Sequence, residues 1–221
     1  MKESSYLNRV TLDYSVTRED NLASAIVHMV GFGLNITGMS LLIVFSALRG
    51  STIQVVSYSL FGAFHTLYYI FSVLFHTLQG ERSRKVFRIF DLNGSYLILI
   101  GILTPLTLSF SQGTKGWFFF YLLISLNVLA IIWISINRKR GDLFLFIVNV
   151  LLLIGIAVFI SLSCNEFDSE LKLWLSISTV VYFLGFSIRY FGGIPYRHSL
   201  SHFFYMLGNL SLFFGFFFQL F

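Results

Sequence analysis

Charged side chains are scarce in this chain of 221 residues: Asp, Glu, Lys and Arg make up 11% of it, and apolar residue types make up 56%. A soluble domain carries roughly 25% charged residues. The low charge and the mean hydropathy of +0.80 exclude a soluble fold and a soluble nucleic-acid-binding module. We therefore expect an integral membrane protein without a sizeable domain outside the bilayer.

Cysteine and an apolar leader segment are lacking as well. Cys164 is the sole cysteine, so an intrachain disulfide is excluded. Residues 1–22 are polar and mixed in charge, without the apolar core of a signal peptide. We therefore expect the first membrane span to direct insertion.

Long apolar runs fill the remainder of the chain. There are seven of them, joined by short connectors, and each is long enough to cross a bilayer as a helix. They predict an all-α membrane protein, a bundle of seven transmembrane helices, with an N-terminal segment over residues 1–21 and a transmembrane domain over residues 22–221. The predicted spans are Leu22–Leu48, Ile53–Leu78, Val86–Phe110, Gly116–Ile136, Leu143–Ser163, Leu171–Phe191 and His198–Phe221.

Basic residues lie mainly on one side of these spans. Twelve of the 15 Lys and Arg residues flank the span ends on the N-terminal side, and the opposite side has Arg49, Lys115 and Lys172. Because loops rich in Lys and Arg stay in the cytoplasm, we predict a cytoplasmic N-terminus and a C-terminus outside. The formal charge of +5 is interpreted as this topology signal, so no nucleic-acid partner is expected.

Two histidines one helical turn apart, His198 and His202, open the last span. Residues four apart share a helix face, so both imidazoles can point at one place. The predicted topology puts His76, at the end of the second span, and Asp91, near the start of the third, at the same depth. Ionisable groups inside spans are costly and mark functional sites. Three histidines and a carboxylate are therefore expected to converge near the cytoplasmic face.

This set of groups is typical of a catalytic zinc site, where three imidazoles bind the ion and one position stays open. Mg²⁺ and Ca²⁺ prefer more oxygen ligands, so we predict Zn²⁺ as the cofactor. Asp91 is expected to take a proton from the attacking water, although direct ligation by Asp91 stays open. Ser72, four residues before His76, faces the same way and is expected to hydrogen-bond the water or a developing oxyanion.

Each residue also has a simpler interpretation when it is taken alone. A histidine pair can serve as a hydrogen bond between helices, Asp91 as a helix N-cap, and Ser72 as a packing residue or a donor to its own backbone. These interpretations do not predict a common depth, so the combination favours a metal site. His28 is expected to contact either the metal ligands or the substrate. His65 lies three helical turns from His76 and is expected to take part in packing or hydrogen bonding.

The order and spacing of these residues resemble the hemolysin III family. The segments that carry the resemblance are Ser72–His76 (SVLFH), Phe90-Asp91 and Pro195–His202 (PYRHSLSH), and the likeness runs from about residue 28 to residue 208. The family is related to the progestin and adipoQ receptors and, more distantly, to alkaline ceramidases. The resemblance implies seven helices with a cytoplasmic N-terminus and an intramembrane zinc ion. It implies zinc ligation by His76, His198 and His202, contact with the attacking water by Asp91, and Ser72 as its neighbour.

The chain departs from the family pattern at two places. Leu92 follows Asp91 where bacterial members usually have His, which removes a polar neighbour of the site. Asp20-Asn21 stands where a Glu-Glu pair is usual, which weakens any role carried over for that acidic pair.

The residues and the resemblance together favour a zinc-dependent hydrolase of lipid amides or esters, with a membrane lipid as the expected substrate. The alternative is a receptor or membrane-homeostasis sensor with a structural zinc ion. A pore-forming haemolysin is less favoured, because no amphipathic pore segment is present, and a retinal protein is excluded because no lysine lies well inside a span. We expect a multi-pass protein of the cell membrane, in a bacterial plasma membrane. The oligomeric state stays open.

Overall fold

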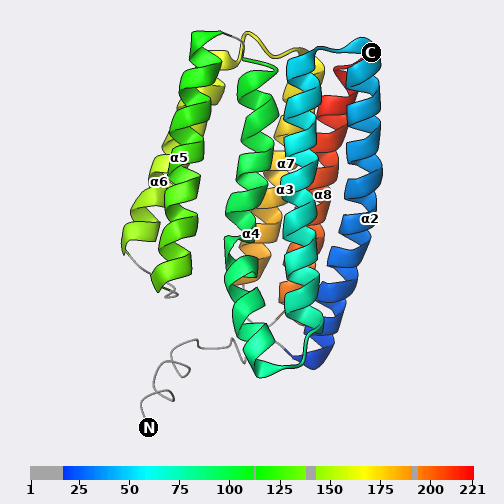
Figure 1. Cartoon of the computed structure of the whole chain (residues 1–221), viewed down its shortest axis with the longest axis vertical. Coiled ribbons are helices and arrows are strands. Elements are labelled where there is room, and N and C mark those ends of the chain that lie inside the picture. The colour runs from blue at the N-terminus through cyan, green and yellow to red at the C-terminus, as the bar shows by residue number, and fades with distance from the viewer. Residues whose placement is uncertain (1–16, 112, 138–142, 191–193) are drawn as a thin grey trace.

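The computed structural model of the chain describes residues 17–111, 113–137, 143–190 and 194–221. All regular structure in these ranges is helical, so the predicted all-α class is confirmed (Figure 1). The seven helices follow the seven predicted apolar stretches to within a few residues. They are α2 (Arg18–Arg49), α3 (Thr52–Thr77), α4 (Glu81–Leu108), α5 (Thr114–Asn137), α6 (Leu143–Ser163), α7 (Ser169–Tyr190) and α8 (Arg197–Phe218).

Five of these helices, α2, α3, α4, α5 and α8, are long and apolar enough to cross a membrane. Membrane crossing by α6 and α7, and the orientation of the termini, stay predictions. The division into an N-terminal segment and a transmembrane domain also stays a prediction, and residues 1–16 of that segment lie outside the described ranges. The connector between the fourth and fifth predicted spans (residues 138–142) and the end of the sixth predicted span at residue 191 lie outside them too.

Local sequence signals explain where the first two helices begin. The Thr17 hydroxyl accepts a hydrogen bond from the backbone N–H of Asp20, at 3.1 Å, and so caps α2. Ser51 and Gln54 form a reciprocal capping box at the start of α3. After these caps, the apolar runs form helices because a helix pairs its own backbone N–H and C=O groups, and lipid offers these groups no hydrogen-bond partner.

The spatial order of the helices differs from their order along the chain. Each helix packs on the next in the order α6, α5, α4, α3, α2, α8, α7, so α2 lies between α3 and α8. The starts of α2, α4 and α8 and the end of α3 lie together at the lower end of the bundle in Figure 1. This arrangement brings residues from both ends of the chain into one neighbourhood.

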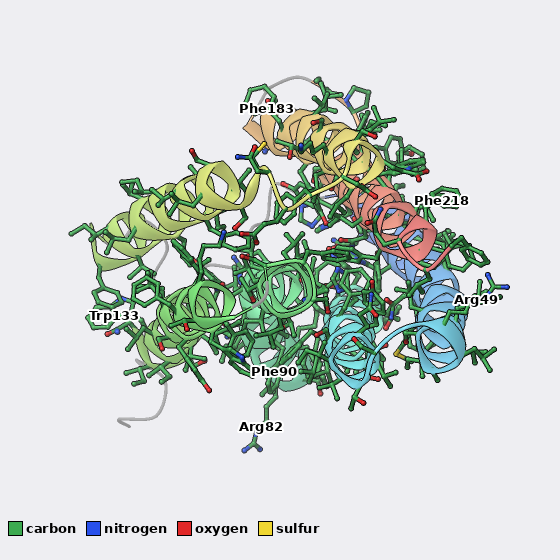
Figure 2. The ribbon with its side chains drawn as sticks, turned by 90° about the horizontal axis from the view of Figure 1, so that it is seen from above. Arg49, Arg82, Phe90, Trp133, Phe183 and Phe218 are labelled. Carbon is green, nitrogen blue, oxygen red and sulfur yellow. The ribbon has the colours of Figure 1, made fainter. Side chains whose placement is uncertain are left out.

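The packing of α4 on α3 is close at Gly94. A Cβ atom at this position would lie 2.5 Å from Cδ2 of the buried Tyr68 ring. Large apolar side chains cover the outside of the bundle, as the outward-pointing Phe90, Phe183 and Phe218 show in Figure 2. An apolar exterior around a buried core is what a lipid environment requires.

Candidate metal centre

Four histidine side chains from three neighbouring helices meet at the lower end of the bundle. His28 lies on α2, His76 is the last but one residue of α3, and His198 and His202 lie in the first two turns of α8. The His76 ring centroid is 5.3 Å from that of His198 and 5.8 Å from that of His202. The His28 centroid is 4.4 Å from that of His202 and 5.6 Å from that of His76. The structure thus brings the three predicted ligands together and adds His28.

The ring nitrogens of this cluster are placed so that they can hold a metal ion. One nitrogen each from His28, His76 and His202 lie within 4.8 Å of one another. The Nε2 atoms of His198 and His202 are 3.2 Å apart, and two ligand nitrogens on a tetrahedral zinc ion lie about 3.4 Å apart. His28 is buried, and neither of its ring nitrogens has a hydrogen-bond partner among the described residues. Because buried polar atoms are normally satisfied, these nitrogens fit a metal ion.

Asp91 and Ser72 lie together beside the histidines. Ser72 is fully buried one turn before His76, and its hydroxyl donates a hydrogen bond of 2.7 Å to Asp91 Oδ1. Asp91 is half-buried and close enough to His28, His76 and His198 for their charges to interact. It lies ten residues after the start of α4, so it is not the N-cap of that helix. The Ser72 hydroxyl is directed to Asp91 and not to its own backbone.

The rings of His198 and His202 lie within hydrogen-bonding distance of each other on α8, through their Nε2 atoms. Behind this pair, the Tyr68 hydroxyl lies 3.4 Å from His202 Nδ1. The Tyr68 ring also packs edge-on against His28, with 5.2 Å between the centroids. Tyr68 therefore supports two of the four imidazoles, and sequence reasoning had not singled it out.

Asp20 and Asn21, set aside in the sequence because they depart from the family pattern, both touch the cluster. Asn21 Oδ1 lies 3.0 Å from His76 Nδ1. The Asp20 carboxylate accepts the backbone N–H of Ser199 at 2.8 Å and that of His198 at 3.3 Å. The signal that could have found them is their position about two helical turns before His28 on α2.

His65 lies deeper in the bundle and belongs to a different polar network. Its Nδ1 atom lies 2.8 Å from the Phe61 carbonyl oxygen, and its Nε2 atom lies 3.0 Å from Asn209 Oδ1. Asn209 in turn donates to the Tyr69 hydroxyl at 2.9 Å and accepts from the Tyr182 hydroxyl. The expectation that His65 takes part in hydrogen bonding is therefore confirmed.

Comparison with known proteins gives a consistent result. The model of a family described as Haemolysin-III related matches residues 16–216. A protein of Bacillus subtilis (strain 168) named hemolysin-3 homolog is 30% identical over 212 residues, which cover 90% of this chain and 93% of that protein. A protein of Bacillus cereus named hemolysin-3 is 26% identical over 201 residues, 89% of this chain and 90% of its own length. With its apolar helices, the chain is a multi-pass membrane protein, and a bacterial plasma membrane is consistent with these relatives.

Proposed function

The chain belongs to the haemolysin-III related family, and from this membership and its histidine cluster we propose that it is a zinc-dependent hydrolase of membrane lipids. The bond cleaved is an amide or an ester. The observation that carries the proposal is a carboxylate, Asp91, held by Ser72 beside a cluster of imidazoles at the end of a helical bundle.

We assign zinc to His76, His198 and His202, with the imidazole nitrogens as ligands. When bound, zinc supplies Lewis acidity that polarises the scissile carbonyl and makes a nearby water more acidic. Ser72 occupies Oδ1 of Asp91 and fixes the orientation of the carboxylate, so Oδ2 is the atom assigned to receive a proton. Ser72 is thereby a positioning residue in this scheme.

The proton transfers then follow from the position of Asp91. The carboxylate accepts one proton from the water that attacks the carbonyl carbon. It returns that proton to the amide nitrogen or ester oxygen as the bond from this atom to the carbonyl carbon breaks. The products are a fatty acid and an amine or an alcohol, and one water molecule is consumed.

The proposal includes a topology. Seven membrane spans with a cytoplasmic N-terminus would put the cluster near the cytoplasmic face, where water is available and a lipid can enter sideways from one leaflet. The five helices that are long and apolar enough to span, and the excess of basic residues on one side, support it. We expect a lipid of the inner leaflet as substrate.

The test compares two site variants with a matched control in purified protein. His76→Ala is expected to lose bound zinc and turnover of acyl-amide and ester lipids. Asp91→Asn is expected to keep zinc and lose at least about 100-fold in kcat, because general-base catalysis contributes about 10² to 10⁴. Asp168→Asn is the control, since Asp168 is exposed and caps α7 through the Leu171 backbone N–H. Full activity of the Asp91 variant would refute the mechanism.

One observation favours a second function, a receptor or sensor with a structural zinc ion. His28 adds a fourth imidazole to the cluster, and four protein ligands are typical of structural zinc sites. Cobalt substitution distinguishes the two functions, because azide changes the visible spectrum only when it can enter an open coordination position. Azide binding to the wild-type protein supports the hydrolase. No azide binding until His28→Leu is introduced, together with no lipid turnover, supports the sensor.

A further inference from the structure

We propose that Asn21 is a positioning residue of the metal centre: its side-chain oxygen fixes the tautomer of His76 so that Nε2 is the nitrogen presented to the metal. The inference rests on the metal site of the proposed function. Asn21 lies in the first turn of α2 and is not itself a ligand.

The orientation of the Asn21 amide is determined by its two partners. Its nitrogen lies 3.2 Å from the Thr17 carbonyl oxygen, one turn earlier in α2. A carbonyl oxygen can only accept, so the atom facing Thr17 must be the NH₂ group. The amide oxygen then faces His76 Nδ1, at 3.0 Å.

The proton on His76 follows from this orientation. An amide oxygen only accepts hydrogen bonds, so Nδ1 must carry the hydrogen and donate it. In the neutral imidazole that binds metals, the lone pair then lies on Nε2. Histidine ligands of metals generally donate their other N–H to a protein acceptor, which fixes the ring and its tautomer. Asn21 has this relation to His76.

Asp20 holds the start of α2 in place for this contact. The N-cap residue of α8, Tyr196, has a left-handed backbone with φ of 55° and provides no side-chain cap. The buried carboxylate of Asp20 takes that role from the neighbouring helix, because it accepts the backbone N–H groups of His198 and Ser199. Negative charge is also favourable at a helix N-terminus. The adjacent Asp20 and Asn21 therefore fasten the first turn of α2 to the ligand-bearing ends of both α8 and α3.

The first experiment measures zinc affinity of purified variants by competition with a chromogenic chelator. Asn21→Leu is expected to weaken zinc binding about 10- to 100-fold, the usual loss for a partner of a ligand histidine. Asn21→Asp retains an acceptor oxygen and is expected to bind zinc at least as tightly as wild type. The matched control is Asn137→Leu, because Asn137 is equally half-buried and donates in the same way to a carbonyl one turn earlier, Trp133 at 3.3 Å. Its zinc affinity is expected to be unchanged.

The second experiment needs no metal. Nitrogen NMR of ¹⁵N-histidine-labelled, metal-free protein reports which ring nitrogen of His76 carries hydrogen, with the signal assigned through His76→Gln. Hydrogen on Nδ1 in wild type, and loss of this preference in Asn21→Leu, are expected. Hydrogen on Nε2 in wild type, or wild-type zinc affinity in Asn21→Leu, would overturn the inference. If wild type binds no zinc, the metal site of the proposed function fails, and the NMR result still decides the role of Asn21.

Discussion

Replacement of Asn209 by leucine removes the centre of the deeper polar network. The Asn209 amide joins the His65 ring, the Tyr69 hydroxyl and the Tyr182 hydroxyl, and all three of these groups lie inside the bundle. Leucine has a branched side chain like that of asparagine but a larger volume, so no cavity forms, and the Asn127→Leu control carries the same increase in volume. The loss specific to Asn209→Leu is that of three hydrogen bonds. Such bonds in membrane proteins contribute about 0.6 kcal/mol on average and up to about 1.7 kcal/mol. We therefore expect Asn209→Leu to lower the free energy of unfolding by about 2–5 kcal/mol.

Asn127 provides a matched comparison on α5. It is fully buried, its NH₂ group donates to the carbonyl of Leu123 in its own helix at 2.9 Å, and its side-chain oxygen has no partner among the described residues. Asn127→Leu therefore removes an unsatisfied buried acceptor and leaves no other side chain without a partner. We expect the free energy of unfolding to be unchanged or to rise by about 1 kcal/mol.

The assay is reversible unfolding in mixed detergent micelles of increasing SDS fraction, followed by circular dichroism, for both variants and wild type. The Asn209 variant is expected to unfold at a clearly lower SDS fraction than the Asn127 variant. Equal destabilisation of the two would mean that any polar-to-leucine change in the bundle has the same effect. The network around Asn209 would then make no specific contribution.

Two further variants test packing and surface charge. Gly94→Ala is expected to lower the free energy of unfolding by about 1–3 kcal/mol, because the added methyl group overpacks against Tyr68, and to weaken zinc binding. Gly33→Ala has open space around it and should raise the free energy of unfolding by up to about 1 kcal/mol. Thermal unfolding of both variants in detergent gives the comparison, and equal melting temperatures would contradict the contact between Gly94 and Tyr68. Glu166, in the connector between α6 and α7, accepts a hydrogen bond from the Lys115 ammonium of α5. This contact lowers the pKa of the Glu166 carboxyl from its usual 4.5. Because the pair is solvent-exposed, Glu166→Gln should cost at most about 1 kcal/mol at neutral pH. This difference should shrink as the pH falls below 4.5 and through the lowered pKa, and a difference that stays the same across the acid range would contradict an ionic origin.

The sequence was sufficient to predict the helices and to place several site residues at one end of the bundle. Apolar runs determine where a helix crosses lipid, and the number of crossings determines at which end His76 and His198 lie. Depth alone does not give the rotation of a helix or its neighbours. The position of α2 between α3 and α8 is what brings His28 against His202, and no pattern along the chain states it.

The contacts of Asn21 were missed for a related reason. Hydropathy placed the start of the first span at Leu22, whereas the helix begins at Arg18. Its polar first turn is therefore part of the packed bundle, because its side chains bond to groups on α3 and α8. An apolar window ends where polar residues begin, even when those residues continue the same helix.

The fastening of α2 to α8 has a consequence for biosynthesis. Translation produces α2 well before α8, so the first turn of α2 has no partner on α8 until nearly the whole chain has been made. A nascent chain that stops before Arg197 already contains His28, His76 and Asp91 but neither histidine of α8. Zinc binding at the proposed site, which uses both histidines of α8, should therefore follow synthesis of that helix.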